Sequence, residues 1–235
     1  MRGDETNPML REFMRLTLYL LFRLLTRLQV TGLEYIPPAG ACIVAGNHLG
    51  ILDGPLLFAL VPRKDLTALV AKKHQRNPIF RMIVNIAGGI WLDRFILEVK
   101  PVQQVQEHLI KGGLLGIAPE GTRSRTHYLM KAKNGVAFLV GKVDVPIIPE
   151  ATTGTEDAVP KLLRLRRPKI TVRFGPSFRL APIDIQDRSG SRQRNTDDIM
   201  CHIAVLLPEK YRGVYADHPR LMELVETGYG TLVSS

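Results

Sequence analysis

Cysteine is scarce in this chain of 235 residues, which contains only Cys42 and Cys201. The two lie far apart and outside any C-x-x-C spacing, so neither a disulfide framework nor a zinc knuckle is indicated. Aromatic residues make up only 6% of the chain. Because no stacking platform or recognised reading motif accompanies the arginines, we expect no nucleic-acid partner.

Long apolar runs are also missing from the N-terminal segment. In the first thirty residues the longest uncharged run, Leu16 to Phe22, lies between Arg15 and Arg23. It is much shorter than the roughly 20 residues that a spanning helix needs. The segment also lacks the small-residue cleavage site of a signal peptide. We therefore expect no transmembrane span. The two unpaired cysteines, for their part, suit a reducing cytoplasm.

The same segment is strongly amphipathic at about 100° per residue. One half of the helical wheel holds Leu10, Phe13, Met14, Leu18, Leu20, Leu21, Leu24, Leu25 and Leu28, and the other half holds Arg11, Glu12, Arg15, Arg23, Thr26 and Arg27. Such a helix can lie in a membrane interface, with leucines below the headgroups and guanidinium groups among lipid phosphates. It can equally pack on the protein's own core, and both interpretations remain open.

Hydrophobic residues make up 45% of the chain, which is enough to bury one sizeable core in a single α/β domain. We expect an N-terminal amphipathic helix over residues 1–30 and one domain over residues 31–235. The formal net charge of +10 favours an anionic partner such as nucleic acid, a phosphorylated metabolite or a membrane surface. The sign of the charge alone does not choose among them.

After Val30, short β-rich runs alternate with helical stretches. Strands are expected at Ala41 to Gly46, Leu66 to Ala71, Gly89 to Leu92, Leu114 to Ala118, Val145 to Ala151 and Lys169 to Phe174. Helices are expected at Gly54 to Leu60, Asn77 to Ala87, Val102 to Lys111, Lys133 to Val143 and Asp197 to Leu207, with an exposed loop from Asp184 to Asn195. This order predicts an α/β fold with a mixed, mainly parallel sheet flanked by helices. Ligands of such sheets bind near the carboxyl ends of the strands.

His48 and Asp53 form an H-x-x-x-x-D motif directly after the first of these strands. An imidazole can remove a proton from a hydroxyl group, and a carboxylate can fix its tautomer. Asp53, ahead of Gly54 and Pro55, also resembles a helix N-cap. The other histidines, at positions 74, 108, 127, 202 and 218, show no ligand spacing, so we expect no metal.

Three further blocks follow the histidine motif. The turn Pro119 to Ser124 combines backbone amides, a hydroxyl and a guanidinium, which suits a phosphate monoester; a solvated strand-end turn is the alternative. Gly88 to Arg94 places another arginine at a strand end. Val145 to Pro149 is an apolar strand bracketed by prolines. Each of these last two blocks, taken alone, suits scaffold better than site.

As an ordered set, the four blocks resemble the signature of the glycerolipid acyltransferase family, which includes bacterial 1-acyl-sn-glycerol-3-phosphate acyltransferases. Asn47 to Asp53 matches N-H-x-x-x-x-D, Gly88 to Arg94 the G-x-x-x-I-D-R-like block, Pro119 to Ser124 P-E-G-T-R-S, and Val145 to Pro149 V-P-I-x-P. Val70 to Lys73 also resembles the V-A-K-K run between the first two blocks. The match covers roughly residues 30 to 175 and implies a glycerol-3-phosphate acyltransferase-like fold.

The resemblance implies a role for each matching residue. His48 is the general base and Asp53 its partner. The expected substrate-binding residues are Asn47, Lys72, Arg94, Glu120, Gly121, Thr122 and Arg123, with Lys73 able to replace Lys72. Val145 to Pro149 is expected to shape an acyl tunnel. The reaction implied is acyl transfer from acyl-CoA or acyl carrier protein to the sn-2 hydroxyl of 1-acyl-sn-glycerol 3-phosphate, without a separate cofactor.

The family also implies a membrane partner, and we expect a peripheral or monotopic protein on the cytoplasmic face of the cell membrane, bound to anionic lipids. The basic stretch Leu163 to Lys169 either contacts headgroups or coenzyme A phosphates, or is a solvated loop. Three positions, His74, Ala118 and Glu150, depart from the family pattern, and Glu150 leaves the acceptor open. Alternatives are glycerol 3-phosphate, another lysophospholipid, a lysoaminolipid, or a catalytically silent lipid-binding protein on the same fold.

Overall fold

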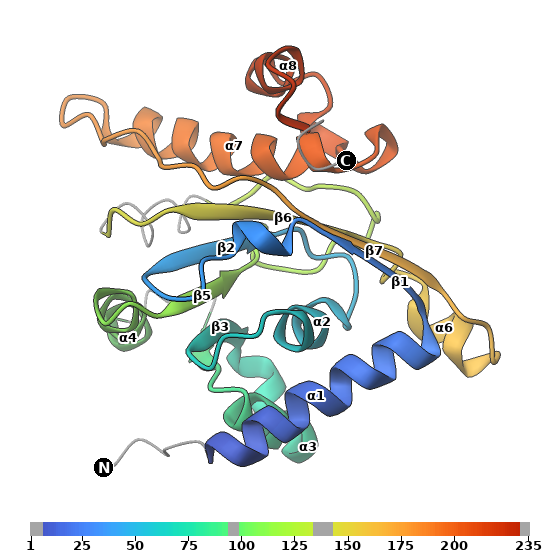
Figure 1. Cartoon of the computed structure of the whole chain (residues 1–235). Coiled ribbons are helices and arrows are strands. Elements are labelled where there is room, and N and C mark those ends of the chain that lie inside the picture. Colours follow the sequence, from blue (N-terminus) through green and yellow to red (C-terminus); the bar gives the residue numbers. More distant parts are fainter. Residues whose placement is uncertain (1–6, 94–98, 134–142, 231–235) are drawn as a thin grey trace.

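The computed structural model describes residues 7–93, 99–133 and 143–230. Within them a seven-stranded sheet carries helices on both faces (Figure 1). The strands are β1 (Arg27–Thr31), β2 (Cys42–Gly46), β3 (Leu66–Ala71), β4 (Ile90–Leu92), β5 (Leu114–Ile117), β6 (Ile147–Thr153) and β7 (Lys169–Phe174). Their order across the sheet is β1-β7-β6-β2-β5-β3-β4, and every pair is parallel except β6 with β7. The predicted mixed, mainly parallel α/β sheet is therefore confirmed.

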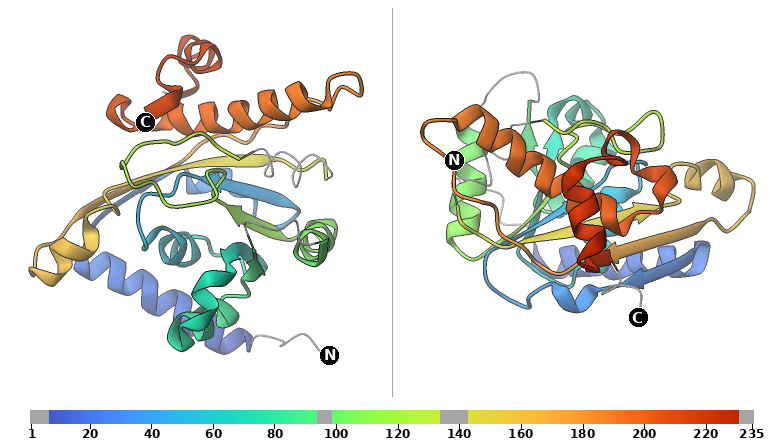
Figure 2. Two further views of the ribbon diagram at one scale, coloured as in Figure 1. Left: turned by 180° about the vertical axis from the view of Figure 1, so that it is seen from behind. Right: turned by 90° about the horizontal axis from the view of Figure 1, so that it is seen from above.

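The central strand β2 shows how the sheet divides the core. Cys42 and Val44 pack on one face together with Phe22 and Leu56. Ile43 and Ala45 pack on the other face. All five residues of β2 are buried, as expected for a strand covered on both sides. Figure 2 shows the two helical layers from behind and from above.

One layer contains α1 (Pro8–Leu25), α2 (Asp53–Leu60) and α3 (Pro78–Ile86), with α6 (Ala158–Leu163) at its end. The opposite face is covered by α7 (Arg188–Leu206) and α8 (Pro219–Glu226), and α4 (Val99–Ile110) lies near the β4 side of the sheet. Short 3-10 turns occur at Leu33–Tyr35, Lys72–Arg76, Glu209–Tyr211 and Gly213–Tyr215.

The six expected strands are all present, but β1 was not expected. Its residues were assigned to the N-terminal helix, which instead ends at Leu25. Thr26 closes the helix by donating its hydroxyl to the Phe22 carbonyl at 2.6 Å, and the chain then pairs with β7 from Arg27 onward. Residues 27–30 therefore belong to the sheet.

The expected loop from Asp184 to Asn195 was wrong from Arg188 onward, because α7 begins there. Asp187 accepts a hydrogen bond from the Gly190 amide at 2.9 Å and so caps the helix. Asn195 is buried and donates to the Ala181 carbonyl at 2.8 Å. Polar residues that favour loops are thus used as a cap and as a buried bridge. The helix expected from Lys133 to Val143 lies, except for its two ends, outside the described residues.

Candidate active site

His48 and Asp53 meet at the carboxyl end of β2. Nδ1 of His48 lies 2.8 Å from Oδ2 of Asp53, and the Gly50 amide donates to the same oxygen at 2.8 Å. The His48 side chain is 29% exposed and that of Asp53 only 9%. A carboxylate that accepts from Nδ1 keeps the proton there, and Nε2 is then left as the basic nitrogen of a solvent-accessible ring.

Asp53 is not the N-cap of α2. The cap residue is Leu52, which makes no side-chain cap bond, whereas the Asp53 carboxylate is held by His48 and Gly50. Its second oxygen, Oδ1, is buried without a partner among the described residues. The carboxylate is therefore committed to orienting the imidazole rather than to starting the helix.

Gly50 permits the tight turn between the two residues. A Cβ atom at this position would lie 2.4 Å from the carbonyl oxygen of Thr155. No side chain fits that space without moving backbone, so the close approach requires glycine. The turn is thereby fixed against the loop after β6, and this close approach was not visible in the sequence.

Glu120 differs in role from the expected phosphate contact. It is only 1% exposed, and its two carboxylate oxygens accept from the backbone amides of His48 at 3.0 Å and Met130 at 3.1 Å. Burial raises the pKa of Glu120 to about 7, against the opposing effect of these donors. Its carboxylate holds the backbone at His48, so we treat it as a positioning residue.

Asn47 is also buried rather than directed to a substrate, with 3% exposure. Its side-chain amide donates to the Thr152 carbonyl at 2.8 Å and accepts from the Thr152 amide at 2.8 Å. The side chain thus imitates a peptide group and extends the β2–β6 ladder by one position. This fixes the backbone just before His48.

The Pro119 to Ser124 turn lies beside His48, because β5 pairs directly with β2. The Ser124 amide donates to the His48 carbonyl at 2.7 Å. Gly121 adopts a left-handed conformation with φ of 68°, which turns the chain so that Thr122 and Arg123 are exposed. The hydroxyl and the guanidinium are therefore available at the same edge of the sheet as the imidazole.

The remaining expected phosphate contacts follow β3 and β4. Lys72 begins the turn directly after β3, which neighbours β5. Arg94 lies outside the described residues, after β4. The turns after β2, β5 and β3 consequently gather at one edge, where ligands of parallel sheets usually bind.

The block Val145 to Pro149 fills the core on both faces of β6. Val145 and Ile147 pack with α7 on one side, and Ile148 packs with α2 on the other. These side chains therefore pack in the interior, and the expectation that the strand helps to shape an acyl tunnel stays a prediction. Glu150, the next residue, is 7% exposed and hydrogen-bonded to the Thr152 hydroxyl, and burial raises its pKa to about 8.

A family model described as Acyltransferase matches residues 27–153, which is more than half of the chain. The chain belongs to the acyltransferase family. The match begins at the first residue of β1 and ends at the last residue of β6, so it contains His48, Asp53, Glu120 and the exposed turn with Thr122 and Arg123.

Two curated relatives of the chain are named 1-acyl-sn-glycerol-3-phosphate acyltransferase. The one from Cocos nucifera is 33% identical over 54% of this chain and 42% of its own length. The one from Borreliella burgdorferi is 29% identical over 54% of this chain and 52% of its own length. The chain thus spans about half the length of the curated relatives it matches.

A solved structure shows the same fold. The crystal structure of the 1-acyl-sn-glycerophosphate (LPA) acyltransferase PlsC from Thermotoga maritima has a TM-score of 0.62 and 22% identity, covering 85% of this chain and 82% of the other. At this identity the likeness concerns the arrangement of the sheet and its helices.

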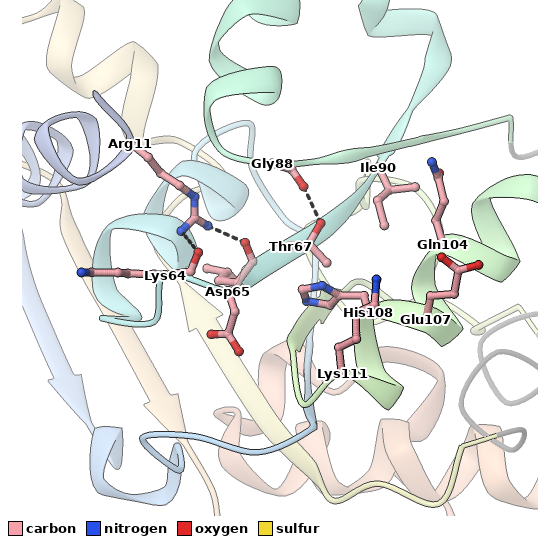
Figure 3. A pocket seen from close by; sticks show the side chains of 11 residues that line it. Arg11, Lys64, Asp65, Thr67, Gly88, Ile90, Gln104, Glu107, His108 and Lys111 are labelled. Carbon is pink, nitrogen blue, oxygen red and sulfur yellow. Dashed lines mark hydrogen bonds between the residues drawn. The ribbon is translucent and has the colours of Figure 1, made fainter. Parts of the chain in front are cut away.

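The N-terminal helix α1 is anchored to the rest of the fold through its arginines, one of which is Arg11. The Arg11 guanidinium is buried and donates to the carbonyls of Arg63, Lys64, Leu66 and Ala87. Figure 3 shows it reaching the backbone at the start of β3. Arg11 is thus bound to the protein itself, which for this side chain favours the second of the two interpretations, packing on the protein's own core.

Arg11 also forms one wall of a cavity of about 340 Å³ at the amino ends of β3 and β4 (Figure 3). Thr67, His108 and Lys111 line its other walls. Since His48 follows the carboxyl end of β2, this cavity lies away from the edge of the sheet that carries His48 and Asp53. Within the described ranges no group of three or more His, Cys, Asp and Glu side chains is arranged to hold a metal ion.

Proposed function

We propose that this acyltransferase moves a fatty acyl group from acyl-CoA or acyl carrier protein to the sn-2 hydroxyl of 1-acyl-sn-glycerol 3-phosphate and forms phosphatidic acid. The observation that carries the proposal is the 2.8 Å contact between His48 and Asp53, next to the exposed Thr122 and Arg123. The names of the two curated relatives support the choice of acceptor.

The proposed reaction is a direct transfer. Nε2 of His48 removes the proton of the acceptor hydroxyl while that oxygen attacks the thioester carbonyl. The tetrahedral intermediate collapses, the C–S bond breaks, and the thiolate takes the proton from the imidazolium. Asp53 stabilises the imidazolium throughout. No acyl-enzyme is required, because the hydroxyl of the acceptor is itself the nucleophile.

The acceptor is positioned by its phosphate in this proposal. The Arg123 guanidinium can bind two phosphate oxygens at once, and the Thr122 hydroxyl can donate to a third. Lys72, in the turn after β3, and Arg94 are proposed as further cationic contacts. Binding the phosphate beside the imidazole supplies the orientation that brings the hydroxyl to Nε2.

We further propose that the enzyme works on a membrane surface, as a peripheral or monotopic protein on the cytoplasmic face. A stripe along α1, here called the outer stripe, is formed by Met9, Phe13, Leu16, Leu20 and Leu24, with exposed fractions of 50% to 81%. The spacing of three and four residues places them on one helical face. Among the described residues, no helix combines the length and apolar content needed to cross a bilayer.

The experiment that tests the proposal follows free thiol and lipid product when the full chain is mixed with long-chain acyl-CoA and different acceptors. We expect thiol release and phosphatidic acid with lysophosphatidic acid. Glycerol 3-phosphate, other lysophospholipids and a lysoaminolipid form the comparison panel. Absence of thiol release with every acceptor, in detergent and in vesicles and with either donor, would contradict the proposal and favour a silent lipid-binding protein.

A further inference from the structure

The last residue of α6 and the turn that follows it expose two large apolar side chains. Leu163 is 81% exposed and Leu165 is 96% exposed. Arg164 and Arg166, which alternate with them, are exposed as well. Fully exposed leucines are unfavourable in water. When they alternate with arginines they suit a membrane interface, where the leucines enter the apolar layer and the arginines meet the anionic headgroups.

The backbone of this turn makes the presence of Leu165 more notable. Its φ is 55°, a left-handed conformation that favours glycine and disfavours any residue with a Cβ atom. The Leu165 amide donates to the Leu162 carbonyl at 2.9 Å, and the Arg166 amide donates to the Lys161 carbonyl at 2.9 Å. This is the arrangement in which a helix usually ends at glycine. Folding alone would therefore favour glycine, since leucine adds strain without burying its side chain.

The turn is tied to the C-terminal end of α1. Nη2 of Arg167 donates to the carbonyls of Arg23 at 3.1 Å and Thr26 at 2.8 Å. In both Figure 1 and the left view of Figure 2, α6 lies beside that end of α1. The backbone of the turn is thus held at the end of α1 where the outer stripe finishes at Leu24, although more than 100 residues separate the two in sequence.

We propose that Leu163 and Leu165 form a second bilayer contact, which enters the interface of an anionic membrane beside α1 while Arg164 and Arg166 bind lipid phosphates. The proposal rests on the membrane location proposed above. A single in-plane helix leaves the protein free to roll about the helix axis. A second contact beside its end prevents that rotation and fixes how the sheet is oriented over the membrane.

Vesicle co-sedimentation of the full chain tests the contact, with vesicles of equimolar phosphatidylcholine and phosphatidylglycerol. Removing one leucine from the interface should weaken partitioning about tenfold. Leu163→Ser tests this directly, with Ile185→Ser as the matched control because Ile185 is 77% exposed in the loop before α7. Leu165→Gly should weaken binding equally and yet raise Tm by about 2–4 °C, because it relieves the left-handed strain. Partitioning of both leucine variants equal to the wild type would overturn the proposal.

A fluorescent probe locates the turn independently of affinity. Cys42 and Cys201 are both buried, so Leu165→Cys and Ile185→Cys each add one accessible thiol for an environment-sensitive label. Adding vesicles should shift the emission to the blue only for the label at position 165. An equal change in emission at both positions would overturn the proposal. Thiol release from acyl-CoA in detergent is measured alongside. A chain inactive in that assay whose label still shifts would contradict the proposed function and leave the second contact standing.

Discussion

Replacing Glu120 with glutamine tests how the catalytic loop is held. The carboxylate accepts one bond from the His48 amide and one from the Met130 amide. Glutamine keeps one acceptor oxygen and sets an NH₂ group against the other donor, so one buried N–H loses its partner. That loss costs about 1–3 kcal/mol of unfolding free energy. Because the shifted backbone carries the imidazole, kcat should fall on the order of tenfold to a hundredfold.

The split between kcat and KM separates this role from a phosphate contact. Urea denaturation and the thiol-release assay are run at pH 8 or above, where wild-type Glu120 is ionised, since its pKa is about 7. We expect a lower kcat with KM for lysophosphatidic acid nearly unchanged. Glu107→Gln, an exposed site on α4, removes the same charge as a control. A raised KM with unchanged kcat and stability would refute the positioning role.

Three further predictions concern separate features of the fold. Asp53→Asn should lower kcat on the order of a thousandfold, because the wrong imidazole tautomer is then favoured; steady-state thiol release measures it, and a loss below tenfold would speak against the pair. Arg11→Met should lower the unfolding free energy by a few kcal/mol in urea titration, since four carbonyls lose their donor; an unchanged midpoint would show that α1 is anchored otherwise. The pKa of Glu150 is raised from 4.5 to about 8, so the folded state keeps a proton that the unfolded state releases, and stability should fall as pH rises from about 4.5 to 8. Glu150→Gln should flatten this slope, and an identical slope would disprove its origin in Glu150.

Much of the sheet could be predicted because most strands are short runs of apolar residues, or of alternating polar and apolar residues, between turn residues. The exact bounds of Leu66–Ala71 and Lys169–Phe174 were found in this way. The strand Arg27–Thr31 escaped because its alternating pattern continues directly from a helix, with Thr26 alone between them. The start of α7 was not predicted, because its polar residues bond to partners that the sequence does not reveal.

The site shows the same limit. The motif predicted that the His48 and Asp53 side chains can meet, and the structure brings them within 2.8 Å. Glu120 and Asn47 were expected at the substrate, but both are buried and bond to backbone of other segments. Their partners, Met130 and Thr152, carry no distinctive side-chain chemistry for this role, since only their main-chain groups take part. The sequence also could not show where Arg11 and Arg15 of α1 point, because both side chains bond to backbone carbonyls of distant segments.

The most direct test of the central claim compares His48→Ala with the wild type in thiol release from acyl-CoA in the presence of lysophosphatidic acid, after matched Tm values show that both are folded. If the imidazole is the general base, the variant should lose activity on the order of a thousandfold or more. Thiol release by the variant at a rate close to that of the wild type would contradict the account.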